Sequence, residues 1–175
     1  MFKAIILKKT EDKTNTVSIE DLNIDDLPKE EILIEVEYST LNYKDSLAVT
    51  NKLPIVKNYP MIPGIDLAGI VRNSSNKNFV IGDKVLLNGS GLGEISWGGM
   101  SQMACVQGNY LIKIPSKFSS MQAMTIGTAG YTAMLAVLAL EKHEITPDKG
   151  EILVTGAPGG VGSISVMLLD KLGYQ

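Results

Sequence analysis

An apolar segment that runs directly into a glycine-rich turn lies at residues 151–163 of this chain. It reads Glu-Ile-Leu-Val-Thr-Gly-Ala-Pro-Gly-Gly-Val-Gly-Ser. The segment 152–154 is typical of a buried parallel strand, and apolar residues recur at helical spacing after the turn. A strand, a glycine turn and a helix together place free N–H groups at the pyrophosphate of a dinucleotide. The pattern therefore predicts cofactor binding by a set of turn residues: Thr155, Ala157, Gly159, Gly160, Val161 and Gly162.

The turn also allows a second interpretation, a tight strand-to-helix connection without a ligand. Alanine takes the first glycine position of the fingerprint, and Pro158 lacks an N–H group that could face a phosphate. The residue that separates NADPH from NADH lies about 20 positions further on, beyond Gln175. The turn predicts a dinucleotide without choosing between these two.

Composition excludes several classes of protein. The net charge of −3 disfavours a nucleic-acid binder. One histidine and one cysteine are too few for a typical zinc site, so no metal is expected. His143 is interpreted as a solvated residue near a helix end, and Cys105 as a small buried residue. Short apolar runs disfavour a signal peptide or a membrane span, which favours a cytoplasmic protein.

The first 118 residues have the pattern of a β domain. Alternation is clearest at 32–38, where Ile32, Ile34, Val36 and Tyr38 are predicted to face the core. Further short strands are expected at 2–7, 17–19, 67–71, 84–87, 100–106 and 110–114, a spacing typical of a barrel or sandwich. The acidic residues of this part are interpreted as a solvated loop and edge: Asp21, Asp25, Asp26, Glu30 and Glu31.

From Ser119 onward the spacing of the apolar residues becomes that of a helix, and Ser119 is a candidate N-cap. Gly127 and Gly130 are expected to interrupt the helical region. The predicted organisation is a β domain at 1–118, connecting helices at 119–150, and the start of an α/β domain at 151–175. One strand and one helix cannot bury both faces of a parallel sheet, so the last unit is expected to be incomplete.

Several motifs resemble those of a known family, in order and across the whole chain. They are Leu41-Asn-Tyr-Lys-Asp-Ser-Leu47, Pro60-Met-Ile-Pro-Gly-Ile-Asp-Leu-Ala-Gly69, Gly82-Asp-Lys-Val85, the loop from Gly91 to Gly99, Gly127-Thr-Ala-Gly-Tyr-Thr-Ala-Met134 and the turn at 154–162. The chain resembles the N-terminal part of the medium-chain dehydrogenases/reductases. Within them it is similar to the quinone-oxidoreductase branch and its acrylyl-CoA reductase-like members.

The resemblance implies a GroES-like β-barrel catalytic domain followed by a Rossmann domain, with the active site in the cleft between them. Zinc enzymes of this superfamily have a cysteine ligand where Asn42 stands and a histidine ligand where Ile65 stands. The implied chemistry is therefore zinc-independent hydride transfer from NADPH, or NADH, to an activated C=C bond of an acryloyl-CoA-like thioester or to a quinone.

The same resemblance implies the catalytic residues Asn42, Tyr43 and Asp45. Asn42 or Tyr43 would hydrogen-bond the developing enolate, with Tyr43 as the acid and Asp45 as a capping or orienting residue. Tyr43, Lys44 and Thr128 would contact the cofactor. The alternatives are packing at a strand end for Tyr43, an exposed lysine for Lys44 and a helix N-cap for Thr128.

The 175-residue chain is expected to be an N-terminal fragment with little or no turnover of its own. Two alternatives stay open: a catalytically inactive GroES-like module, and a broader quinone or enal reductase. The full-length protein is expected to form a homodimer and to act on a small molecule, with no nucleic acid and no membrane as partner.

Overall fold

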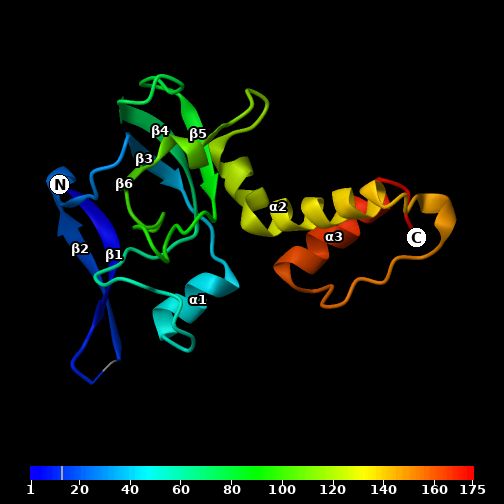
Figure 1. Ribbon diagram of the computed structural model, residues 1–175, viewed down its shortest axis with the longest axis horizontal. Coiled ribbons are helices and arrows are strands. Elements are labelled where there is room, and N and C mark those ends of the chain that lie inside the picture. Colours follow the sequence, from blue (N-terminus) through cyan, green and yellow to red (C-terminus); the bar gives the residue numbers. More distant parts are fainter. Residues whose placement is uncertain (13) are drawn as a thin grey trace. The chain divides into compact units, whose positions relative to one another are not determined.

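The computed structural model describes residues 1–12 and 14–175, which form two compact units, Met1–Thr125 and Ile126–Gln175 (Figure 1). The first unit is built from antiparallel strands. β1 (Phe2–Lys9) and β2 (Asn15–Leu22) pair as a hairpin. A separate five-stranded sheet has the order β6-β3-β4-β5-β7. Its strands are β3 (Ile32–Tyr38), β4 (Asp66–Ser74), β5 (Lys84–Asn88), β6 (Met103–Val106) and β7 (Ile112–Lys113).

The predicted alternation of β3 is confirmed over its first half. Ile32 and Ile34 are fully buried and pack with Leu67 and Val85 of the neighbouring strands. The prediction is wrong for Tyr38, whose side chain is half exposed. The β3–β4 register shifts between Val36 and Tyr38, and such an irregularity ends the strict two-residue period.

Isolated bridges connect the hairpin to the rest of the unit, and close backbone packing joins β4 to β3. Ala4 bridges to Ser101, and Leu7 bridges to Met61. Gly69 lies so close to β3 that a Cβ atom there would be 2.0 Å from the backbone oxygen of Glu35. The β-rich first domain is thus confirmed, although its strands at 100–106 and 110–114 are shorter than predicted.

Three short helices interrupt the β pattern where only strands and loops were expected. They are η1 (Ile24–Asp26), α1 (Tyr43–Thr50) and η2 (Gly108–Tyr110). α1 begins at a capping box formed by Asn42 and Asp45. This N-cap and N3 spacing is a recognised start of a helix, so the sequence contained the signal.

α2 (Ser120–Lys142) begins as predicted at Ser119, whose Oγ accepts from the backbone N–H of Gln122 at 3.2 Å. The helix is kinked at Gly127, which has φ 50° and ψ −163°, whereas Gly130 is helical and does not interrupt it. α2 is long and apolar enough to cross a membrane by length and composition, a test that core helices of soluble proteins also pass.

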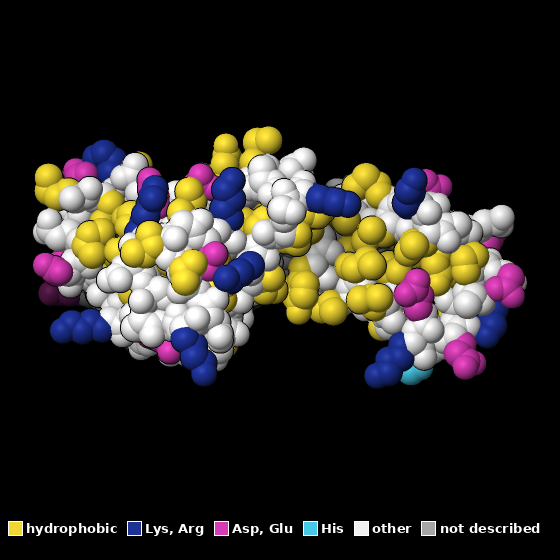
Figure 2. All heavy atoms as spheres, turned by 90° about the horizontal axis from the view of Figure 1, so that it is seen from above, with side chains coloured by type: hydrophobic (Ala, Val, Ile, Leu, Met, Phe, Trp, Pro, Cys, Tyr) yellow, Lys and Arg dark blue, Asp and Glu magenta, His cyan; other side chains and the backbone are white. Residues whose placement is uncertain are grey.

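The second unit contains the rest of α2, η3 (Pro147–Lys149) and α3 (Gly160–Lys171). Val137, Leu169 and Tyr174 form its core, and Ile152 and Val154 pack against it. Residues 151–154 do not form the predicted strand. Ile152 N donates to the backbone oxygen of Gln175 at 2.6 Å, but no strand among the described residues pairs with this segment. Large apolar side chains remain exposed in this unit, and Figure 2 shows such side chains gathered on its visible face: Met134, Leu135, Leu138 and Leu153 are among the exposed ones.

Candidate functional site

The predicted catalytic residues lie at the N-terminus of α1. Asn42 is the N-cap, and Tyr43 and Lys44 are the first two residues of the helix. The Tyr43 side chain is 80% exposed, so it does not pack at a strand end. A pocket is lined by Met100 and by the three residues that directly precede Asn42 in the sequence, Ser39, Thr40 and Leu41. This end of the helix therefore offers a phenol to solvent beside a half-buried amide.

Asp45 has the capping role that was expected of it. Its buried carboxylate accepts from the backbone N–H of Asn42 at 2.7 Å and from that of Ile65 at 3.0 Å. Desolvation by burial raises the pKa of Asp45 above its usual value, and the nearby charge of Asp66 acts in the same direction. Asp45 thus joins the start of α1 to the segment that precedes β4.

Asp66 is a buried residue of this site that the sequence reasoning missed. Its side chain is fully buried, and its carboxylate accepts from Asn42 Nδ2 at 2.9 Å and from Asn88 Nδ2 at 2.8 Å. Its backbone oxygen also accepts from Ser39 Oγ at 2.7 Å. The available signal was an acidic residue within the otherwise apolar run 60–69, because a buried carboxylate needs dedicated partners.

Lys44 forms an ion pair with Glu94, which lies in the loop of residues 91–99. The loop packs tightly on the backbone before β4. A Cβ atom at Gly98 would lie 2.4 Å from the backbone oxygen of Pro63, and one at Gly99 would lie 2.1 Å from that of Asp66. Both positions need glycine for this close approach, so the glycine loop supports the same segment that carries Asp66.

The positions at which the resemblance places zinc ligands have no metal-binding chemistry in this chain. Asn42 donates its amide to Asp66, and Ile65 has an aliphatic side chain. Within residues 1–12 and 14–175, no group of three or more His, Cys, Asp or Glu side chains could hold a metal ion. Asparagine and isoleucine cannot replace a thiolate and an imidazole as zinc ligands.

The glycine turn of the second unit has the backbone geometry that its sequence predicts. Gly156 has φ 65°, and its carbonyl oxygen accepts from Gly159 N at 2.9 Å. Gly159 is the N-cap of α3, and Gly162 packs on the turn so closely that a Cβ atom there would lie 2.3 Å from Gly156 O. The turn leads directly into the helix, whose first N–H groups have no intrahelical acceptor.

The other predicted cofactor residues of this unit lie in two places, at the kink of α2 and beside the glycine turn. Thr128 directly follows the kink at Gly127 and is half-buried. Thr155 and Val161 are exposed beside the glycine turn, while Ala157 is half-buried. The predicted residues of the glycine turn thus lie together, and Thr128 is the first residue of α2 after the kink.

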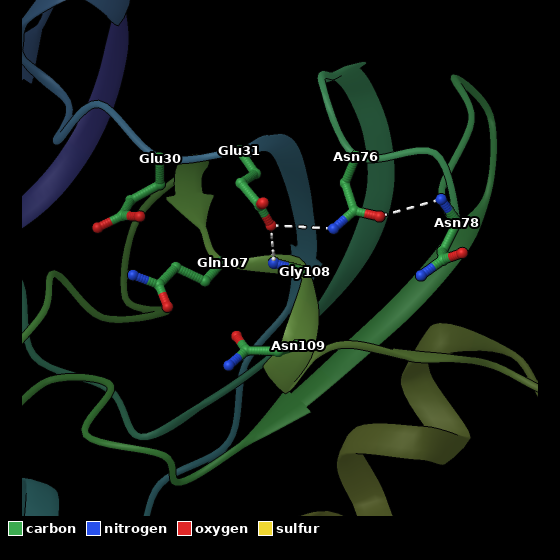
Figure 3. A pocket seen from close by; sticks show the side chains of 7 residues that line it. All are labelled: Glu30, Glu31, Asn76, Asn78, Gln107, Gly108 and Asn109. Carbon is green, nitrogen blue, oxygen red and sulfur yellow. Dashed lines mark hydrogen bonds between the residues drawn. The ribbon is translucent and has the colours of Figure 1, made fainter.

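The acidic residues 30–31 line a polar pocket rather than only a solvated edge (Figure 3). Glu31 Oε2 accepts from Asn76 Nδ2 at 3.0 Å and from Gly108 N at 2.8 Å. These hydrogen bonds lower the pKa of Glu31, that from Asn76 first and that from Gly108 second. Asn78, Gln107 and Asn109 complete a lining of amides. Glu31 therefore joins the loops before β3, after β4 and after β6.

His143 and Cys105 were predicted to have no functional role, the first as a solvated residue and the second as a buried one. His143 is exposed and directly follows α2. Cys105 lies on β6 and is half-buried rather than buried, and its thiol donates to the backbone oxygen of Glu30 at 3.5 Å. Desolvation raises the pKa of the Cys105 thiol, which disfavours the reactive thiolate.

Comparison with known proteins agrees with this geometry. Residues 28–116 match the alcohol dehydrogenase GroES-like domain. The acrylyl-CoA reductase AcuI of Ruegeria pomeroyi is 48% identical over 100% of this chain and 53% of its own length. The YhdH oxidoreductase of Salmonella enterica, solved in complex with NADP, superposes with a TM-score of 0.96 at 49% identity, covering 99% of this chain and 53% of that one.

The Bacillus subtilis protein YhfP, solved with NAD bound, superposes with a TM-score of 0.94 at 43% identity, again over 99% of this chain and 53% of that one. The chain spans about half the length of the curated relatives it matches. The match to the domain family covers more than half of the chain, and the antiparallel strands of the first unit agree with it. The chain belongs to the alcohol dehydrogenase GroES-like domain family, within the medium-chain dehydrogenase/reductase superfamily.

Proposed function

We propose that the protein carrying this sequence is a zinc-independent, NADPH-dependent reductase of activated C=C bonds, with an acryloyl-CoA-like thioester as its substrate. The observation that carries the proposal is that two features occur in the same chain. Buried carboxylates hold the N-terminus of α1, where Asn42 and Tyr43 lie, and a glycine turn precedes α3. The name of the Ruegeria relative supports the substrate class, and the NADP in the Salmonella structure supports the cofactor.

The second unit fits a dinucleotide on its own geometry. The positive φ of Gly156 and the close packing of Gly162 bring the turn backbone tightly to the start of α3, with no side chain between them. Gly159 and Gly160 are exposed at this end of the helix. Backbone N–H groups of residues 160–162 would hold the phosphates, and Thr155 and Thr128 would contact the rest of the cofactor. A bound nicotinamide would supply the hydride.

The residues at the start of α1 are proposed to act on the substrate. A thioester conjugated to an alkene carries its own electron sink, so negative charge develops on the thioester oxygen as the β-carbon is reduced. The exposed Tyr43 hydroxyl is proposed to donate a hydrogen bond to this oxygen and to supply the proton. Asp45 keeps the first turn of α1 in place through its two backbone hydrogen bonds. Lys44 is engaged by Glu94, so its proposed cofactor contact would compete with that ion pair.

Two alternative functions are kept for this protein. One is a broader quinone or enal reductase on the same site. The other is a non-catalytic GroES-like module, and we propose that the 175-residue chain alone has little or no turnover. A homodimer and a cytoplasmic location are proposed for the full-length protein.

A parallel assay distinguishes these readings. NADPH oxidation is measured with acryloyl-CoA and with a simple quinone, for the 175-residue chain and for the product of the complete coding sequence. The proposal predicts a clear preference for acryloyl-CoA in the complete product. Preference for the quinone favours the broader reductase, and no turnover of either substrate favours the non-catalytic module.

A further inference from the structure

The buried carboxylate of Asp66 receives amide hydrogen bonds on both of its oxygens. Asn42 Nδ2 donates to Oδ2 at 2.9 Å, and Asn88 Nδ2 donates to Oδ1 at 2.8 Å. Asp66 is fully buried at the start of β4, whereas Asn42 and Asn88 are only half-buried. One buried carboxylate thus accepts hydrogen bonds from two side-chain amides that are partly exposed to solvent.

This arrangement fixes which way the Asn42 amide points. A side-chain amide has a donor end and an acceptor end of nearly the same shape, so its orientation is set by its hydrogen-bond partners. A carboxylate only accepts, so the nitrogen of Asn42 must face Asp66. The donor end is therefore directed at the buried carboxylate of Asp66, and the amide oxygen lies at the capping side, toward the backbone N–H of Asp45.

We infer that Asp66 is a positioning residue, which holds the Asn42 amide in one orientation at the start of α1. The inference rests on the proposed function for the identity of the ligand that Asn42 meets. A bound substrate or cofactor then meets Asn42 in a single amide orientation, beside the Tyr43 hydroxyl that is proposed to stabilise the developing enolate oxygen.

The orientation is tested by NMR on the 175-residue chain labelled with ¹⁵N-asparagine. The side-chain NH₂ signals of Asn42 are identified by their loss in Asn42→Ser. We expect these protons to exchange slowly with water and to shift in Asp66→Asn, which replaces the acceptor by an amide of the same shape. The matched control Asp21→Asn changes an exposed carboxylate that pairs with Lys3, and should leave the Asn42 signals in place. Asn42 signals that do not respond to Asp66→Asn overturn the inference.

A second variant and a wild-type measurement cover the case in which Asp66→Asn does not fold. Asn88→Ser removes the amide that donates to Oδ1 of Asp66 and keeps Asn42 itself unchanged. It should shift the Asn42 signals without bringing their hydrogen exchange to the rate of a free amide. If the Asn42 protons of the folded wild-type chain already exchange as fast as those of free asparagine, the inference is wrong whatever the variants do.

A kinetic measurement on the complete gene product tests the consequence for a ligand. Asp66→Asn is expected to lower kcat/KM by about 100-fold, the cost typical of misplacing an active-site group. A raised KM should accompany this loss, whereas a merely structural defect would lower the active fraction and leave KM unchanged. An unchanged KM overturns the positioning role. A wild-type protein with no reductase activity overturns the proposed function instead, and the NMR result then decides the orientation alone.

Discussion

The buried carboxylate of Asp45 accepts a hydrogen bond from the backbone N–H of Ile65 at 3.0 Å, across 20 residues of sequence. Its other oxygen caps α1 by accepting from Asn42 N at 2.7 Å. One side chain thus fixes the start of a helix and joins it to the segment that enters β4. The exposed Tyr43 and the half-buried Asn42 take their positions from this link.

Replacing Asp45 should therefore destabilise the fold. Asp45→Ala leaves two N–H groups without their acceptor, and we expect a loss of about 3 kcal/mol in the free energy of unfolding. Asp45→Asn keeps one acceptor oxygen and should cost less. Chemical denaturation followed by circular dichroism measures both. Asp21→Ala, on an exposed residue, should change stability by less than about 0.5 kcal/mol, and equal losses for all three variants would contradict the capping role.

The raised pKa of Asp45 predicts a specific pH dependence. Burial raises the folded-state pKa above the usual 3.8, so in the window just above that value the folded state binds more protons than the unfolded state. Stability contributed by this group is then present at low pH and is lost as pH rises. The difference in unfolding free energy between wild type and Asp45→Asn should decrease as pH is raised from about 4 to about 7. A difference that grows over this range would contradict the burial argument.

The glycine turn of the second unit gives a matched pair of substitutions. A Cβ atom at Gly162 would lie 2.3 Å from Gly156 O, whereas one at Gly160 would meet only Ala129 Cβ at 3.5 Å. We expect Gly162→Ala to destabilise the chain by about 2 kcal/mol through overpacking. Gly160→Ala should be neutral or stabilising by up to about 1 kcal/mol. Equal effects in thermal denaturation would show that the turn does not have this close packing.

Much of the fold follows from local pattern, whereas the site depends on contacts distant in sequence. The alternation at Ile32 and Ile34 and the cap at Ser119 need only nearby residues, so they could be predicted. The register shift before Tyr38 could not, because it depends on how β4 pairs. Asn42, Tyr43 and Asp45 are predicted site residues through motif resemblance, but Asp66 was missed because its amide partners are 22 and 24 positions away.

The ion pair between Lys44 and Glu94 should contribute little to stability. Both side chains are partly exposed, and water screens such pairs. A double-mutant cycle with Lys44→Met and Glu94→Gln should give a coupling energy of about 0.2–1 kcal/mol, decreasing as salt is added. A larger, salt-independent coupling would show instead that the pair is a structural anchor of the loop 91–99.

Tyr43 should affect activity without affecting stability. Its side chain is 80% exposed, so Tyr43→Phe removes a hydroxyl from the surface and leaves the core unchanged. In the complete gene product we expect kcat/KM to fall by about 100-fold or more, as for loss of a general acid, with a change in unfolding free energy below about 0.5 kcal/mol. Full activity of Tyr43→Phe would remove this residue from the proposed mechanism.

The central claim is that a hydride passes from NADPH to the β-carbon of an activated thioester. It is tested most directly by supplying the complete gene product with acryloyl-CoA and NADPH deuterated at the transferable position of the nicotinamide, and examining the product by mass spectrometry. The proposed function predicts a saturated thioester with one deuterium at its β-carbon. Consumption of NADPH without deuterium in the thioester, or an unchanged acryloyl group, would contradict it.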